Sequence, residues 1–77
     1  MVKKGDVVKA LDFPGNDTCF MVGTVVAVVN DLVYCTLLKQ VFDGEDLPVE
    51  DGKTFTTPQV GAYMMDAMYP NRLTVLA

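Results

Sequence analysis

Carboxylates are the most densely spaced candidates for chemistry in this sequence, and they gather within residues 43–51. The acids in this segment are Asp43, Glu45, Asp46, Glu50 and Asp51. Such a cluster could bind Ca²⁺, which takes about six to eight oxygen ligands. The regular ligand spacing of an EF-hand is absent, however, and Pro48 interrupts the segment. A solvated loop without metal is therefore the preferred interpretation, and a calcium site is the alternative.

Two cysteines, Cys19 and Cys35, are the other reactive side chains, and the sequence contains no histidine. The usual general base is thus missing, and a cysteine nucleophile needs a partner that lowers its pKa. Two cysteines alone match none of the ligand spacings of zinc. A two-residue turn at Asn30-Asp31 would place Val26 opposite Cys35, with Cys19 too distant for a disulfide. The sequence therefore predicts buried thiols, no cofactor and no enzymatic activity.

The balance of charge argues against nucleic acid as a partner. Ten acids and six bases give a formal net charge of −4, whereas binding a polyphosphate requires a concentrated basic surface. The bases are scattered: Lys3, Lys4, Lys9, Lys39, Lys53 and Arg72. The chain start lacks an apolar secretory core, and the longest apolar run, residues 25–29, is too short to span a bilayer. We therefore expect a cytoplasmic protein with no membrane partner.

β-Branched and aromatic residues indicate five strands, over residues 7–11, 19–29, 32–42, 53–57 and 72–76. Asn30-Asp31 separates the second strand from the third and predicts a tight hairpin turn. Gly23 interrupts the second strand, which predicts a bulge or a sharp bend there.

A helix is expected over residues 59–69, because Thr57 suits the N-cap and Pro58 the first helical position. The helical stripe carries Gly61, Met64, Met65 and Met68. The preferred interpretation is a helix that plugs the mouth of a barrel, with Asp66 on its exposed side. The alternative is an adaptable binding surface in which Tyr63 and Tyr69 accompany the methionines.

These elements predict a mainly β fold in a single domain over residues 1–77. Five short strands, one long bent hairpin and a short helix before the last strand favour a small SH3-like five-stranded barrel. An OB-like barrel and an open β-meander are the alternatives.

Both faces of the predicted hairpin are apolar, which is unusual for a small barrel that buries only one. One face carries Val22, Thr24, Val26, Val28, Val33, Cys35 and Leu37, and the other carries Val25, Ala27, Val29, Leu32, Tyr34, Thr36 and Leu38. Either the methionine-rich helix covers the second face, or a second subunit does. Small size favours the subunit, and the residues of this self-association face are Val25, Ala27, Val29, Leu32 and Leu38.

Several short motifs carry a family resemblance. Residues 10–13 and 69–73 resemble the ALYDY and late Pro-Ser-Asn-Tyr-Val segments of eukaryotic SH3 domains, but the sequence lacks the tryptophan of their peptide groove. Residues 4–8, with Gly23-Thr24-Val25-Val26, resemble the small uncharacterised SH3-like barrel proteins of bacteriophages and marine bacteria. KOW-type members of this superfamily bind RNA or ribosomal proteins. The resemblance therefore implies a fold and, as an alternative function, a nucleic-acid face with Lys3, Lys4, Lys9 and Arg72.

The predicted function is a non-enzymatic protein–protein interaction or assembly module that forms a homo-oligomer. Large apolar side chains near strand ends and the helix are the candidates for a ligand or partner surface: Tyr34, Phe55, Tyr63, Met64 and Tyr69.

Overall fold

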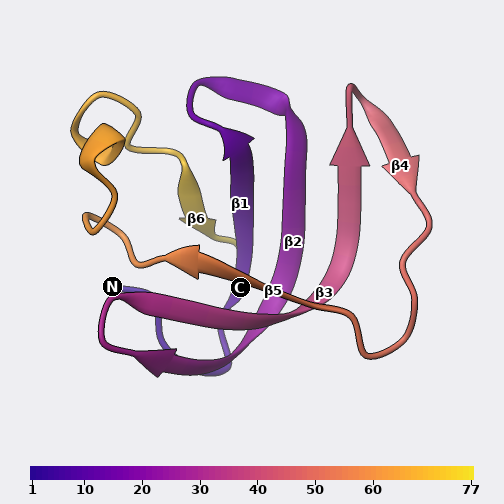
Figure 1. The fold of residues 1–77 in the computed structure, drawn as a ribbon, viewed down its shortest axis with the longest axis horizontal. Helices are drawn as coiled ribbons and strands as arrows, with labels where there is room; N and C mark the ends of the chain where they lie inside the picture. Colours follow the sequence, from indigo (N-terminus) through magenta and orange to yellow (C-terminus); the bar gives the residue numbers. More distant parts are fainter.

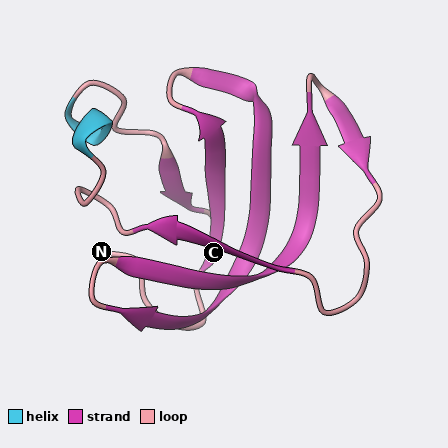
Figure 2. Cartoon of the chain, in the orientation of Figure 1, coloured by secondary structure: helices cyan, strands magenta, loops and turns pink.

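Asn30 and Asp31 form the predicted two-residue turn, from which the two longest strands run antiparallel. The computed structural model describes residues 1–77. Six antiparallel strands form one sheet, and the only helical segment is a short 3₁₀ turn (Figures 1 and 2). The elements are β1 (Val7–Phe13), β2 (Asn16–Val29), β3 (Leu32–Phe42), β4 (Glu45–Leu47), β5 (Thr54–Pro58), η1 (Met64–Ala67) and β6 (Leu73–Val75). The mainly β fold class is confirmed.

The bent hairpin of β2 and β3 is shared between two layers. The strand order is β4-β3-β2-β1-β6, and β5 pairs with the part of β3 nearest the hairpin turn. One layer therefore contains β1, β4 and β6 with the far ends of β2 and β3. The other layer contains β5 with the ends of β2 and β3 nearest the hairpin turn. Figure 1 shows β5 crossing in front of β1 and β2.

Gly23 lies at the bend of β2, as predicted. The register between β2 and β3 shifts beside it, because Leu38 has no partner on β2. A Cβ atom at Gly23 would lie 2.6 Å from the Phe55 ring and 2.6 Å from the carbonyl oxygen of Thr36. Only glycine allows the backbone of β2 to approach its neighbours this closely.

A second bulge, at Val26, corrects the predicted register. Val25 lies opposite Cys35 and Ala27 opposite Tyr34, so Val26 is left without a partner. Because side chains alternate along a strand, the extra residue turns Val25 inward. Val25 is only 1% exposed, and its assignment to a self-association face is wrong.

The core fills the space between the two layers. Its buried members are Val2, Val8, Ala10, Val25, Val33, Cys35 and Leu73, with Val28 and Phe55 packed against them. Val2 reaches this core from the N-terminal segment. The strand hydrogen bonds do not close into the predicted barrel, since β5 and β6 remain unpaired with each other. We call the gap between these two strands the seam.

The predicted helix over residues 59–69 is wrong. Its only helical part is the 3₁₀ turn η1, whose N-cap residue makes no side-chain cap hydrogen bond. Thr57 and Pro58 remain in β5, and the Thr57 hydroxyl accepts a hydrogen bond from Arg72 instead of capping a helix. Gly61 adopts a φ of 82°, which a right-handed helix cannot accommodate. No helix of the chain has the length and apolar character needed to cross a membrane.

The predicted acidic loop begins with a short strand, β4, that the sequence did not predict. Asp43 and Gly44, with φ values of 51° and 80°, form a two-residue turn between β3 and β4. Asp-Gly is a favoured pair for such hairpin turns, because both central residues need positive φ. The turn pairs Phe42 with Glu45 and extends the sheet by one short strand.

Candidate interaction surfaces

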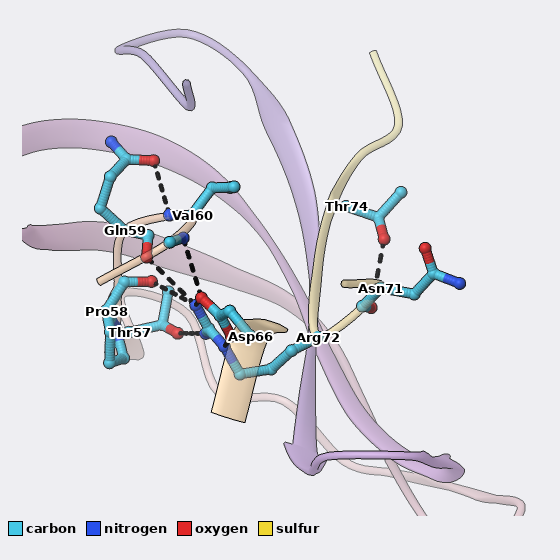
Figure 3. A network of polar contacts seen from close by, with 9 residues as sticks. Thr57, Pro58, Gln59, Val60, Asp66, Asn71, Arg72 and Thr74 are labelled. Atoms are coloured by element: carbon cyan, nitrogen blue, oxygen red, sulfur yellow. Dashed lines mark hydrogen bonds and ion pairs between the residues drawn. The ribbon is translucent and has the colours of Figure 1, made fainter. Parts of the chain in front are cut away.

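Arg72 bridges the seam between β6 and β5 with its side chain (Figure 3). It directly precedes β6 and is only 5% exposed. Its guanidinium group donates from Nη1 to the Thr57 hydroxyl at 2.9 Å, and from Nη2 to the carbonyl oxygens of Pro58 at 3.0 Å and Gln59 at 3.2 Å. These bonds replace the backbone pairing that a closed sheet would have at this position.

Asp66 of η1 completes the coordination of the guanidinium group. Arg72 donates to it twice, from Nε at 2.6 Å and from Nη2 at 3.0 Å, which is the bidentate geometry that arginine favours with carboxylates. The Gly61 N–H also donates to this carboxylate at 2.9 Å. The hydrogen bonds from Arg72 are the main reason that the pKa of Asp66 lies below its usual range. We call residues 60–70 the η1 segment. The Arg72–Asp66 pair therefore holds the η1 segment against the end of β5.

Gln59 forms a second buried contact, with the N-terminal segment. Its Oε1 accepts hydrogen bonds from the N–H groups of Val2 at 3.0 Å and Val60 at 2.9 Å, and its Nε2 donates to the Val2 carbonyl at 2.9 Å. The amide side chain thus pairs with the Val2 backbone as a neighbouring strand would. No buried side-chain nitrogen or oxygen lacks a partner, so the seam is held by satisfied polar groups.

The structure corrects two predictions about these residues. Asp66 is half-buried beside Arg72, so it does not lie on the exposed side of a helix. Arg72 is buried and fully hydrogen-bonded, which removes it from the predicted nucleic-acid face. Lys3 and Lys4 remain exposed, and the Lys9 ammonium lies 4.3 Å from the centre of the Phe20 ring.

Two of the three methionines in the predicted stripe are exposed, so its assignment to a barrel plug is wrong, and only Met65 is half-buried. Met64 is 86% exposed and Met68 is 71% exposed. Val60 and Tyr63 are exposed on the same segment. We call these four residues the methionine patch. A shallow hollow of about 350 Å³ lies among Val60, Tyr63, Met64 and Pro70, so the patch has the adaptable apolar character of the alternative interpretation.

The outer surface of the β2-β3-β5 layer forms a second apolar area, which we call the hairpin face. Strand pairing aligns its residues in three rows. The rows are Val29, Leu32 and Pro58; Ala27, Tyr34 and Thr56; and Thr24, Thr36 and Thr54. None of these side chains is charged. Val29 is 52% exposed and Leu32 is 42% exposed, and the two lie directly opposite each other.

A cleft lies where the free edge of β5 faces β1. It has a volume of about 260 Å³. Ala10 and Met21, which are paired across β1 and β2, line it together with Thr56 of β5. Tyr63 and Arg72 also border it. The cleft therefore joins the seam to the methionine patch.

The five residues predicted for a ligand surface do not come together. Tyr34 lies on the hairpin face, while Phe55 points to the other side of the layer and packs on the core. Tyr63 and Met64 belong to the methionine patch. Tyr69 is half-buried with its ring against Gly15, where an added Cβ would lie 2.8 Å from it. Only the residues of the η1 segment remain as one surface.

Three of the five residues predicted for a self-association face lie together in the structure. Val29 and Leu32 lie side by side on the hairpin face, and half-buried Ala27 adjoins them. Leu38 is exposed but lies at the bulge beyond the bend, outside the three rows. The 3₁₀ turn η1 itself does not pack extensively against β2 or β3, and Val29 and Leu32 remain exposed.

The thiols and carboxylates form no reactive cluster. Cys19 and Cys35 are both buried and free, as expected. Burial raises the pKa of the Cys35 thiol, and the Cys19 sulfur accepts a hydrogen bond from the Asp43 N–H at 3.3 Å. Nowhere do three or more acidic, cysteine or histidine side chains lie close enough to hold a metal ion.

Sequence reasoning missed the Arg72–Asp66–Thr57 network and the role of Gln59. No local pattern indicates these contacts, because the partners are separated by up to 57 residues. Comparison with models of protein families gave no match, and neither did comparisons with characterised proteins or with solved structures.

Proposed function

We propose that this chain is a non-enzymatic protein–protein interaction or assembly module that associates with a second copy of itself through the hairpin face. The observation that carries this proposal is an uncharged outer surface that includes the exposed pair Val29 and Leu32 beside the hairpin turn. Exposed contiguous apolar surfaces on small domains mark interaction sites. Two copies that bury this face would also add to a core with few buried apolar residues.

The proposal includes a finer description of the fold as an SH3-like barrel. The sheet places β6, β1, β2, β3 and β5 side by side in that order, with a 3₁₀ turn before the last strand. Two layers that share a bent hairpin support this description. The Arg72 side chain links β6 to β5 at the seam, and the Gln59 side chain links the end of β5 to the N-terminal segment. The proposal also includes a cytoplasmic location and a bacteriophage or marine bacterial type of protein.

Sedimentation velocity at micromolar concentration tests the self-association. The wild-type protein is expected to sediment as a dimer or larger species. Leu32→Lys places a charge on the apolar row of the hairpin face and is expected to give a monomer. Leu76→Lys is the matched control, because Leu76 is exposed outside the strands, and it should associate like the wild type. A monomeric wild-type protein would contradict the proposal.

The alternative nucleic-acid function has less support, since Arg72 is committed to the seam and three scattered lysines remain. A mobility-shift titration at low salt separates the two functions. Salt-sensitive binding to DNA or RNA would favour the alternative. Absence of binding, together with a dimeric wild type, would support the assembly module.

A further inference from the structure

The free edge of β5 has unpaired backbone groups that face away from β3. Lys53 and Gln59, which flank the strand, bond to β3 residue Leu37 at 2.8 Å and to turn residue Asp31 at 2.7 Å. Since antiparallel bonding alternates along a strand, Phe55 and Thr57 also turn their N–H and C=O groups toward β3. Thr54 and Thr56 therefore turn theirs toward the free edge.

Arg72 limits this free edge at one end. Pro58 follows the same alternation as Thr54 and Thr56, so it too faces the free edge. It has no N–H group, and its carbonyl oxygen already accepts a hydrogen bond from Arg72. The groups left for a partner are thus the N–H and C=O of Thr54 and Thr56. This is the hydrogen-bonding capacity for a short added strand.

The cleft beside this edge is suited to the side chains of such a strand. Its floor includes buried Ala10 and half-buried Met21, and its rim includes Leu11 and Asp12. The Asp12 carboxylate is exposed and belongs to neither of the two ion pairs in the molecule. The cleft therefore offers an apolar floor and an unpaired negative charge next to an open strand edge.

We propose that an extended peptide segment of a partner protein binds here by adding a strand to the free edge of β5. Its backbone bonds to Thr54 and Thr56, an apolar side chain lies over Met21, and a basic side chain lies near Asp12. Such pairing places the segment about 4.8 Å from β5. Thr56 lines the cleft and Thr54 does not, so the part of the segment that bonds to Thr56 lies in the cleft. A single strand brings only its own width to this edge, whereas the β5 edge of a second folded copy carries its own β1 and η1 segment beside it.

This site deepens the proposed protein-binding function. It uses the backbone edge of β5, whereas self-association uses the outward side chains of the hairpin face, to which Thr54 and Thr56 also contribute. The inference rests on the proposal that this chain binds other proteins, but it does not require self-association. Failure of the two proposals is therefore distinguishable. A monomeric wild type would contradict only the hairpin-face dimer, and the experiment below addresses only the β5 edge.

The test removes one donor from the free edge. Thr56→Pro deletes the N–H that faces the cleft and leaves the β3 ladder intact, and Pro58 shows that this edge accepts proline. Thr56→Ala is the matched control, because it keeps the N–H. A displayed library of random peptides is selected against the wild-type protein, and the enriched peptides are titrated against each variant.

We expect the enriched peptides to have apolar residues at every second position and to carry a basic residue. Their affinity should fall at least about tenfold with Thr56→Pro, stay within about twofold with Thr56→Ala, and weaken with Asp12→Asn. A peptide has two sets of alternate amides, and N-methylation of the set that faces β5 should abolish binding to the wild type while methylation of the other set should not. This comparison decides the question even if Thr56→Pro does not fold. No enrichment, equal binding by folded Thr56→Pro, or binding by every N-methylated peptide would overturn the proposal. Loss of self-association in Thr56→Pro but not in Thr56→Ala would assign the edge to a second copy instead, because both variants change the Thr56 side chain on the hairpin face and only the first removes the N–H.

Discussion

Arg72 donates a hydrogen bond to the hydroxyl of Thr57, 2.9 Å away, and thereby joins the start of β6 to the end of β5. β6 pairs only with β1 and β5 pairs only with β3, so the two strands do not pair with each other. One side chain thus supplies, at the seam, the link that backbone pairing supplies elsewhere. The stability of the two-layer arrangement should depend on this residue more than on any other base.

Arg72→Met is expected to lower the free energy of unfolding by about 3 kcal/mol, because it leaves the Asp66 carboxylate beside β5 without its partner. Denaturant unfolding measures this change. Lys53→Met is the control, since Lys53 is exposed and makes no ion pair. The two variants lose the same charge, so equal stability would show that the network contributes nothing.

Acid should weaken the same network. The pKa of Asp66 in the folded protein lies below its usual range, chiefly because Arg72 donates hydrogen bonds to the carboxylate. The unfolded chain therefore binds this proton at a higher pH than the folded chain does. The stabilisation is complete above the unfolded pKa of about 3.9 and is lost as pH falls through the lower folded value.

Asp66→Asn tests this acid dependence. At neutral pH the variant should be less stable than the wild type, and its stability should fall less steeply below about pH 4. Unfolding curves at several pH values measure both slopes. Parallel slopes for the two proteins would rule out Asp66 as a source of the acid dependence.

Gly23→Ala should destabilise the bend of β2 by about 2 kcal/mol or more, because the new Cβ overlaps the Phe55 ring and the Thr36 carbonyl oxygen. Gly44→Ala provides a comparison. Gly44 has a φ of 80° and no neighbouring atom within 4 Å of an added Cβ, so only backbone strain of about 1–2 kcal/mol applies. Thermal unfolding should rank the two variants in that order, and the reverse order would contradict the close approach at Gly23.

Both thiols should react slowly in the folded protein. Cys19 and Cys35 are buried, and burial raises the pKa of Cys35. A disulfide reagent should therefore modify them only after denaturant is added, since the nucleophile is an exposed thiolate. Rapid reaction of one thiol in native buffer would contradict this, and it would reopen the prediction that the protein is not an enzyme.

Local patterns predicted the parts of the fold that depend on neighbours in the chain. The Asn30-Asp31 turn, the bend at Gly23 and all five predicted strand regions follow from turn chemistry and β-branched residues. The Asp43-Gly44 turn carried a comparable signal, but the acidic residues around it obscured the strand that follows. The prediction of a helix over residues 59–69 was wrong because Thr57 and Pro58 suit both the start of a helix and the end of an edge strand. In the structure their tertiary contacts with β3 and Arg72 place them in a strand.

The sequence alone determined a small antiparallel β protein with an apolar hairpin, because alternation and turn residues act over a few positions. Only the tertiary structure decided which side chains of that hairpin are buried. A single unpaired residue, Val26, reverses the faces of β2 and buries Val25. The seam, the exposed methionines and the open edge of β5 also arise from contacts between distant residues, which no local pattern records.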